Sequence, residues 1–203
     1  MEEQPNTTPA AKPDLRARRR ARTIETIRKE AMALVTQHGL DHVTAEMIAE
    51  AAGISLRTFF NYFTYKEETL IPPPLGFPAE SAAAFVSGTG PILEDLVHLL
   101  EERLIELEPE RKNIRVIMGM SESHPRLQSV REHTFRQYET EFRALLGKRL
   151  SLAPNHHTPT LMASVISASF RVAMCRWVEK DSNSVIDELR ATLTQLPVLF
   201  SDT

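Results

Sequence analysis

Residues 44–63, TAEMIAEAAGISLRTFFNYF, contain the pattern that decides the fold of the N-terminal part of the chain. Thr44 can cap a helix because its hydroxyl can accept an early backbone N–H. Gly53, which has no Cβ, can end that helix in a left-handed conformation, and Ser55 can cap a second helix at once. Two short helices joined so closely cross steeply, which predicts a helix-turn-helix. The small or apolar residues of the first helix recur at helical spacing and share one face: Ala45, Ile48, Ala49 and Ala52.

The second helix, predicted over residues 56–63, has an unusual outer face. Phe59 and Phe63 lie four residues apart and can point inward together with Ile54. An exposed aromatic side chain beside charged and amide groups indicates a surface that a partner covers. Double-stranded DNA is the partner we expect, although a helical hairpin with a solvated outer face has the same inner pattern. The side chains left on the outside are Leu56, Arg57, Phe60 and Asn61.

These residues resemble the tetracycline-repressor (TetR) family of bacterial transcription regulators. The resemblance implies that the second helix enters the major groove of DNA. It also implies a small, largely apolar effector bound in the body of the protein and a dimer formed by the last two helices. The family commonly has Tyr at the position of Phe60, so a hydroxyl contact is missing here. The resemblance covers residues 22–70 and rests on VT at 43–44, IA at 48–49, AGIS at 52–55, TFFNYF at 58–63 and KE at 66–67.

Candidate DNA contacts fall into two groups. Arg57 is the first candidate for a base contact, because its planar guanidinium matches O6 and N7 of guanine. Phe60 can pack against thymine methyl groups, and Asn61 can contact a base edge or the DNA backbone. The resemblance puts Lys66 at the DNA backbone, and we expect the hydroxyl groups of Thr44, Thr58 and Tyr62 to bind phosphates with it. The full set is Thr44, Ser55, Leu56, Arg57, Thr58, Phe60, Asn61, Tyr62 and Lys66.

Charge is distributed unevenly along a chain with the composition of a soluble globular protein. Its 203 residues are 42% hydrophobic and 25% charged, with a net charge of −3. Residues 1–66 hold ten Lys and Arg against eight Asp and Glu, a net +2, and the remainder holds fourteen against nineteen, a net −5. A basic end on an acidic body suits a protein that presents one end to DNA. We expect no membrane span and no secretory signal, and therefore a cytoplasmic protein.

Three segments follow from the order of these patterns. Residues 1–15 carry three prolines among small polar residues, and we expect a disordered arm. Residues 16–66 form the helix-turn-helix DNA-binding domain, whose first helix is predicted over residues 22–38. The basic run RARRRAR, residues 16–22, precedes that helix, where it can be merely solvated or can reach phosphates or a minor groove. Residues 67–203 form a helical effector-binding and dimerisation domain, which makes the chain all-α.

The body is predicted to be helical throughout. Pro72–Pro74 keeps the helix that starts at Lys66 short, whereas family members often continue it. Two apolar stripes, at residues 161–177 and 185–200, mark the last helix pair, and small residues beside the first stripe allow a second copy to approach closely. Plain core packing is the alternative for that pair. Further helices are expected at residues 79–86, from 92 to before 109, at 111–121 and at 125–150.

Methionine and aromatic side chains of the body are candidates for an effector-binding cavity. A helical body rich in such side chains can leave a cavity of about 300–1,000 Å³. Packing in the core is the alternative for each of them. The candidates are Met118, Met120, Phe135, Tyr138, Phe142, Phe170, Met174 and Trp177.

The chain lacks the patterns of cofactor binding and catalysis. No phosphate-binding loop or dinucleotide fingerprint is present, so we expect no cofactor. The histidines do not have the spacing of a metal site, and the single cysteine, Cys175, is expected to be a buried, inert thiol. Our hypothesis is a one-component, ligand-responsive transcription regulator, most simply a repressor, that binds a palindromic operator as a homodimer. The alternatives are a partner-binding or structural helical protein without DNA binding, and a helical enzyme, for which we find no converging acid–base groups.

Overall fold

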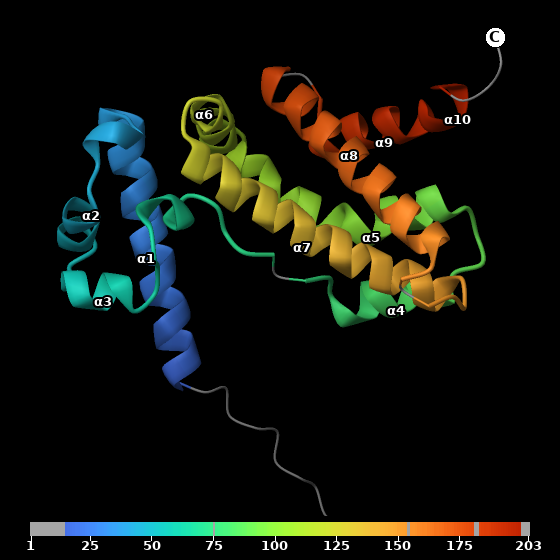
Figure 1. Ribbon diagram of the computed structural model, residues 1–203, viewed down its shortest axis with the longest axis horizontal. Coiled ribbons are helices and arrows are strands. Elements are labelled where there is room, and N and C mark those ends of the chain that lie inside the picture. Colours follow the sequence, from blue (N-terminus) through green and yellow to red (C-terminus); the bar gives the residue numbers. More distant parts are fainter. Residues whose placement is uncertain (1–14, 75, 154, 181–182, 200–203) are drawn as a thin grey trace, which may run out of the picture. The chain divides into compact units, whose positions relative to one another are not determined.

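The structure of the 203-residue chain is a computed structural model that describes residues 15–74, 76–153, 155–180 and 183–199 (Figure 1). The described residues form helices joined by turns, without a strand among them, which confirms the all-α prediction. The chain divides into two compact units, Met1–Leu70 and Ile71–Thr203. This division falls at Leu70 rather than at the expected residue 66. The expected disordered arm lies outside the described residues as far as residue 14.

The first unit is a small three-helix core with two 3₁₀ turns. Its elements are α1 (Leu15–His38), η1 (Leu40–His42), α2 (Ala45–Ala51), α3 (Leu56–Phe60) and η2 (Lys66–Thr69). Of the positions expected to face inward, Ile48, Ala49, Phe59 and Phe63 are buried, whereas Ala45, Ala52 and Ile54 are half-buried. Helix α1 adds the buried side chains of Ile27, Ala31 and Val35 to this core.

Helix α1 begins seven residues earlier than the sequence analysis placed it. The basic run at residues 16–22 is therefore part of α1 and does not precede it. Arg and Ala are strong helix formers, and the stretch from Leu15 to His38 contains no Gly or Pro to interrupt the helix. The hydroxyls of Thr23 and Thr26 donate to the carbonyls of Arg19 and Arg22, at 3.0 Å in each case, and so follow the same helical path.

The second unit is a helical bundle. Helix α8 packs against both α7 and α9, and α5 packs against α4 and α9. The core of the bundle combines leucines from α5, α7 and α9 with Phe142 and Trp177. Its elements are α4 (Ala79–Ser87), α5 (Ile92–Leu107), η3 (Glu108–Glu110), α6 (Arg111–Ser121), α7 (Pro125–Arg149), α8 (His157–Glu179), α9 (Val185–Thr194) and α10 (Leu196–Leu199) (Figure 1).

The short helix α4 is fixed to the end of α7 by one buried arginine. The guanidinium of Arg149 donates to the carbonyls of Phe85 at 2.7 Å and Gly90 at 2.8 Å. It also pairs with the carboxylate of Asp95 at 2.6 Å. Gly88 leaves room for this arrangement, since a Cβ there would lie 2.6 Å from Asp95 and 2.8 Å from Arg149. The expected helix at 79–86 is thus present, and it is anchored within the second unit.

One helix of the described residues, α8, is long and apolar enough to cross a membrane by length and composition, with a hydropathy of 1.3 over its most apolar window. Its apolar side chains include Ala163, Ile166 and Trp177, which are buried in the core of the second unit. One side of α8 therefore belongs to the core of the second unit, and 44% of that apolar window is buried.

Candidate functional site

The turn between α2 and α3 is built by caps at both helix starts and by one glycine. Thr44 Oγ1 accepts the backbone N–H of Met47 at 3.3 Å, and Ser55 Oγ accepts that of Thr58 at 3.1 Å. Gly53 has a φ of 66°, in the left-handed region that favours glycine. The backbone N–H of Ile54 returns to the carbonyl of Ala49 at 2.9 Å and closes the turn. These local bonds hold α3 at a fixed angle to α2.

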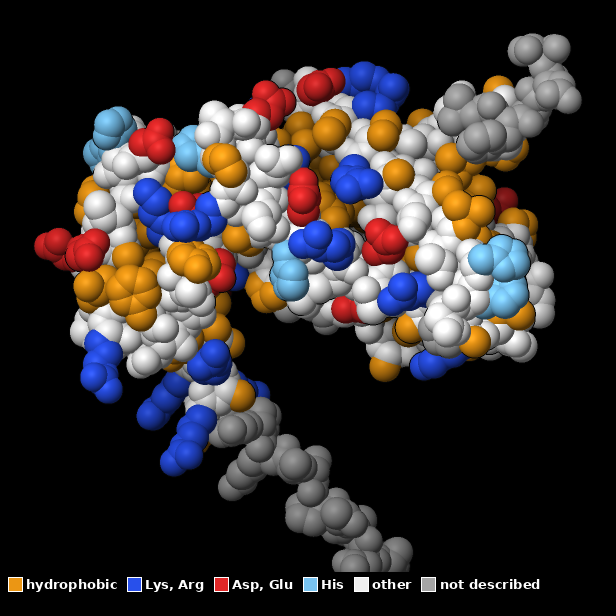
Figure 2. Space-filling view, in the orientation of Figure 1, with side chains coloured by type: hydrophobic (Ala, Val, Ile, Leu, Met, Phe, Trp, Pro, Cys, Tyr) orange, Lys and Arg blue, Asp and Glu red, His pale blue; other side chains and the backbone are white. Residues whose placement is uncertain are grey.

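The outer face of α3 exposes three of the four side chains expected there from the sequence, and the fourth, Leu56, is half-buried. Arg57 and Asn61 are exposed, and the side chain of Phe60 is 52% exposed. Beneath it, the ring of Phe59 is fully buried and meets the Phe60 ring edge-on, with 5.4 Å between centroids. Helical hydrogen bonding continues past Phe60, because the N–H of Phe63 donates to the carbonyl of Phe59 at 3.0 Å. Figure 2 shows a hydrophobic patch on the surface over α3.

The hydroxyl groups of the site are already engaged in holding the helix starts. Ser55 Oγ and Thr58 Oγ1 lie 2.8 Å apart. The pKa of the exposed Glu46 carboxyl is lowered mainly by a hydrogen bond from its own backbone N–H. A hydrogen bond with the Thr44 side chain lowers it further. The other expected contact residues, Leu56 and Tyr62, are half-buried. The face that remains open to a large ligand is therefore made mainly by the side chains of α3.

Lys66 has an intramolecular role that the sequence analysis did not predict. Its ammonium donates to the carbonyls of Leu40 and Val43, at 2.7 Å each. Leu40 is the first residue of η1, and Val43 directly precedes Thr44, the cap of α2. Since an ammonium carries three N–H groups, one remains for a further acceptor. Lys66 thus positions the start of α2, whatever else it contacts.

Arg28 binds the other end of η2, the 3₁₀ turn that begins at Lys66, and the sequence did not indicate this contact either. Its guanidinium donates to the carbonyl of Thr69 at 3.2 Å and lies 5.3 Å from the centre of the Phe63 ring. Burial lowers the pKa of Arg28 to about 10, against the opposing effect of the nearby Glu68 carboxylate. A lone arginine in the middle of α1 gave no sequence signal for this contact.

A row of arginines lies along the first turns of α1. All five side chains are exposed, and Figure 2 shows the Lys and Arg side chains gathered there. Arg20 stacks over the ring of Tyr62, with 4.9 Å from its guanidinium carbon to the ring centre, so the row lies next to the end of α3. The helical extension of α1 therefore adds positive charge beside the exposed face of α3. The row consists of Arg16, Arg18, Arg19, Arg20 and Arg22.

The eight candidate effector contacts differ in how deeply they are buried in the second unit. Phe142, Met174 and Trp177 are buried in the core, whereas the other five are half-buried. The ring centroids of Phe135 and Phe170 lie 6.2 Å apart, and those of Phe142 and Phe77 lie 5.1 Å apart; Phe77 is outside the expected set. Two surface pockets of the second unit, one beside α7 and one beside η3, are lined by other residues than these eight.

The structure places the candidate metal ligands and the single thiol of the chain. No group of three or more His, Cys, Asp or Glu side chains there could hold a metal ion. Cys175 is exposed on α8, so the expectation of a buried thiol is wrong. The helical register explains the difference, because Cys175 falls on the outer side of α8 while Met174 and Trp177 occupy the inner side.

A rigid helix-turn-helix whose second helix exposes an aromatic ring beside a guanidinium and an amide, next to a cationic row, defines a DNA-binding protein. Comparison with known proteins gives the family. Residues 27–70 match the profile of bacterial regulatory proteins of the tetR family, and residues 103–200 match that of the MftR C-terminal domain. The chain belongs to the TetR family of bacterial transcription regulators, which is not a family of enzymes.

Relatives of known sequence or structure agree with this assignment. The HTH-type transcriptional regulator TcmR of Streptomyces glaucescens is 43% identical over 61 residues, which are 30% of this chain and only 27% of that relative. FadR of Thermus thermophilus, a TetR-family repressor solved with lauroyl-CoA, shares the fold at 19% identity, with 89% of this chain and 96% of that chain covered and a TM-score of 0.55. NalD, the secondary repressor of the MexAB-OprM multidrug efflux pump in Pseudomonas aeruginosa, gives 20% identity, coverage of 86% and 94%, and a TM-score of 0.56.

Proposed function

We propose that this protein is a cytoplasmic, ligand-responsive transcriptional repressor that binds a palindromic operator as a homodimer, with α3 in the major groove. The observation that carries this proposal is the outer face of α3, where Phe60 is 52% exposed between the exposed Arg57 and Asn61 on a helix fixed at both ends. Repression follows from occupying promoter DNA and excluding polymerase.

Base reading rests on three side chains of α3. Arg57 donates to O6 and N7 of a guanine, an arrangement that discriminates against a wrong base by about 1–3 kcal/mol. Phe60 packs against thymine methyl groups, and its edge-on contact with the buried Phe59 keeps the ring from folding back. Asn61 contacts a neighbouring base edge or the backbone. Ser55 and Leu56, at the start of α3, complete the contact surface.

Phosphate contacts fix the register of α3 on the duplex. Hydroxyl groups around α3 come from Thr44, Thr58 and Tyr62. The N–H of Lys66 that does not donate to a carbonyl binds a phosphate of the DNA backbone. The arginine row of α1 adds further cations, held beside α3 by the stacking of Arg20 on Tyr62. Each such contact adds affinity that does not depend on sequence and that falls with salt.

The dimer is formed through α8 and α9. An exposed stripe runs along α8, in which Leu161 is 64% exposed and Val172 is 50% exposed. Ala168 and Cys175 are also exposed and fall on the same stripe, at spacings of seven, four and three residues. Large exposed apolar side chains in one row favour contact with a second copy. Two reading helices on a twofold axis then require half-sites about 34–36 Å apart or a multiple of this distance.

A small, largely apolar effector bound in the second unit releases the operator. Support comes from Trp177, which is fully buried while its indole N–H has no hydrogen-bond partner among the described residues. Entry of an effector among the candidate residues requires the core around Phe142 and Met174 to open. A coupling free energy of about 1–3 kcal/mol between the effector and DNA weakens operator binding about 5- to 150-fold.

The proposal is tested by mixing the purified protein with sheared genomic DNA and sequencing the fragments that it retains. We expect one enriched motif with twofold symmetry, and a dimer by light scattering under the same conditions. Retention without any common motif, or retention of a motif without symmetry by a monomer, would contradict the proposal. Because Trp177 is the single tryptophan, a change in its emission on adding a ligand reports binding in the interior.

A further inference from the structure

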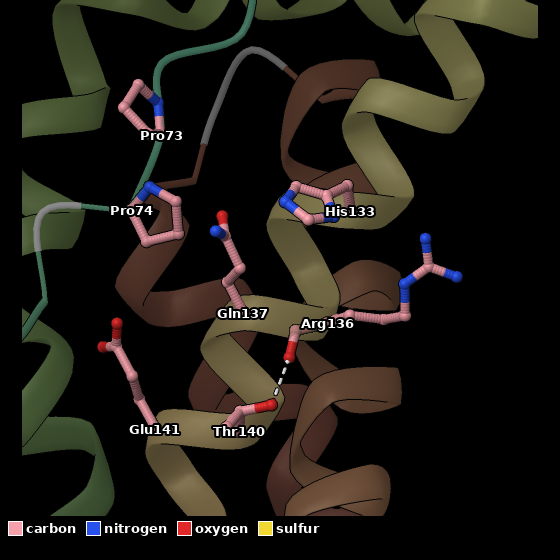
Figure 3. Close-up of a pocket in the computed structure, with 7 residues that line it drawn as sticks. All are labelled: Pro73, Pro74, His133, Arg136, Gln137, Thr140 and Glu141. Atoms are coloured by element: carbon pink, nitrogen blue, oxygen red, sulfur yellow. Dashed lines mark hydrogen bonds between the residues drawn. The ribbon is translucent and has the colours of Figure 1, made fainter.

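A cavity lined by two prolines and five polar or charged side chains lies beside α7. Its volume is about 470 Å³, and its walls are Pro73 and Pro74 on one side and α7 on the other. His133, Gln137 and Glu141 follow one another at four-residue spacing on α7, and Figure 3 shows them projecting from one side of that helix toward the two prolines. Arg136 extends away from the prolines (Figure 3). The remaining lining residue is Thr140, whose hydroxyl donates to the carbonyl of Arg136 at 2.9 Å.

The proline wall of the cavity is held in place by the residues that follow it. The ring of Phe77 lies 5.1 Å from Phe142 and 6.3 Å from Tyr138, so this segment is anchored on α7. Gly76 has a φ of 71°, and a Cβ built there would lie 3.9 Å from Glu141 Oε2. The segment therefore passes directly by the Glu141 carboxylate. The rigid rings of Pro73 and Pro74, followed by the anchored ring of Phe77, keep this segment from collapsing onto α7.

Among the charged side chains that line this cavity, the Glu141 carboxylate is half-buried, whereas His133 and Arg136 are exposed. Glu141 makes no hydrogen bond or ion pair with another described residue. Loss of hydration raises the pKa of Glu141, and the half-buried Tyr138 beside it has its pKa raised by burial and then by the charge of Glu141. Arg103, the cation close enough to affect Tyr138, is paired with Glu106 at 2.8 Å. A carboxylate in this state is stabilised by any cation that enters.

We propose that the cavity binds a small organic cation, whose amidinium or ammonium group pairs with Glu141 and whose flat or apolar body lies against the rings of Pro73 and Pro74. The side-chain carbonyl of Gln137, one turn away on α7, accepts a second N–H from the ligand. The volume of the cavity falls within the range of about 300–1,000 Å³ that is typical of small-molecule sites. This site is separate from the interior around Trp177.

A ligand at this site contacts Pro73 and Pro74, three and four residues after Leu70, the last residue of the first unit. An effect of the cation on operator binding rests on the proposed function, whereas binding at Glu141 does not. The two are therefore measured separately.

Binding is tested by calorimetric titration of the full chain with benzamidinium, and with benzamide as the neutral molecule of the same shape. We expect benzamidinium to bind the wild type, benzamide not to bind, and Glu141→Gln to weaken benzamidinium about tenfold or more, since a charge-assisted contact is lost. Glu132→Gln is the matched control, because Glu132 is an exposed carboxylate on the same helix outside the cavity. Equal affinity for benzamidinium in the wild type and Glu141→Gln, or equal binding of benzamide and benzamidinium by the wild type, would overturn the proposal.

A second measurement guards against a folding defect. Glu141→Gln removes a partly desolvated charge without changing shape, so its melting temperature at pH 7 should equal or exceed that of the wild type. A markedly lower melting temperature would contradict an unpartnered Glu141. Operator affinity is then measured with and without benzamidinium. An unchanged operator affinity with intact binding at Glu141 would leave the cation site in place and overturn its regulatory role, whereas failure of the wild type to bind any operator would count against the proposed function alone.

Discussion

The two units of this protein use their aromatic side chains in opposite ways. In the first unit Phe60 is 52% exposed on a helix whose ends are capped and whose inner ring, Phe59, is fully buried. In the second unit Phe142 is 3% exposed and Trp177 fully buried, and the pocket beside α7 is lined by polar groups and prolines. The first unit therefore presents a finished surface for a rigid partner. In the second unit Phe142 and Trp177 belong to the core, so a ligand that reaches them has to displace core contacts.

The largest effect should come from removing the ring that supports the exposed one. Phe59→Ala removes a fully buried aromatic side chain and is expected to cost the first unit about 3–5 kcal/mol, enough to unfold it. Helical content and melting followed by circular dichroism should lose the contribution of the first unit, while the second unit keeps its transition. Phe60→Ala is the matched control on the neighbouring ring: it should melt like the wild type and still lose operator affinity. Equal melting of the two variants would contradict the difference between the rings.

The next effect concerns sequence reading. Arg57→Ala should reduce affinity for the operator by about 1–3 kcal/mol, or roughly 5- to 150-fold, because a bidentate contact with guanine is lost. Affinity for unrelated duplexes should change far less, as measured by fluorescence anisotropy. Arg18→Ala, on the arginine row, serves as the control, since it should weaken all duplexes to a similar degree. An equal loss on operator and unrelated DNA for Arg57→Ala would assign Arg57 to the phosphates.

Substitution of Lys66 tests how much its two hydrogen bonds contribute to the stability of the first unit. Lys66→Ala leaves the carbonyls of Leu40 and Val43 without their donor, and we expect a loss of about 1–3 kcal/mol in stability. DNA binding should weaken for all sequences, and the slope of log affinity against log salt should fall by about 1. Titrations at several salt concentrations separate the two roles. Lower stability with an unchanged slope would mean that Lys66 only positions α2.

The smallest effect is expected in the second unit, at Glu188. Its carboxylate is buried and accepts from Arg176 at 2.9 Å and from Asn183 at 2.7 Å, and these contacts lower its pKa to about 2. Because the folded pKa lies below the ordinary value of 4.5, the stabilisation is complete above pH 4.5 and is lost as the pH falls toward 2. Arg176 and Lys180 are about half exposed, so solvent weakens the pairing. Acid titrations of the wild type and Glu188→Gln should converge as the pH approaches 2, and parallel curves would contradict the prediction.

Sequence reasoning succeeded where the interactions are local. The caps at Thr44 and Ser55 span three residues, and the glycine turn is read from Gly53 alone, so the helix-turn-helix and its outer face follow from a short stretch. It failed where contacts join distant positions. Arg149 reaches Phe85 across 64 residues and Lys66 reaches Leu40 across 26, and neither side chain carries a signal for its partner.

The effector region shows the same limit. A count of methionines and aromatic rings predicts an apolar interior, but whether that interior is filled or hollow depends on how several helices pack together. Phe77 was not in the expected set, and yet it anchors the proline wall of the cavity beside α7. The arginine run was seen in the sequence, but its helical geometry depends on the absence of a helix breaker before His38 and was missed.

The central claim is that α3 reads DNA through its exposed face, and selection from random duplexes tests it most directly. The wild type and Arg57→Ala are each put through repeated selection on a library of random double-stranded DNA, and the retained sequences are compared. The account predicts that the wild type selects an inverted repeat with half-site centres about 10–10.5 base pairs apart or a multiple of this spacing, and that the variant loses preference at one guanine in each half-site. Identical selected sequences for the two proteins, or no selected sequence for the wild type, would contradict it.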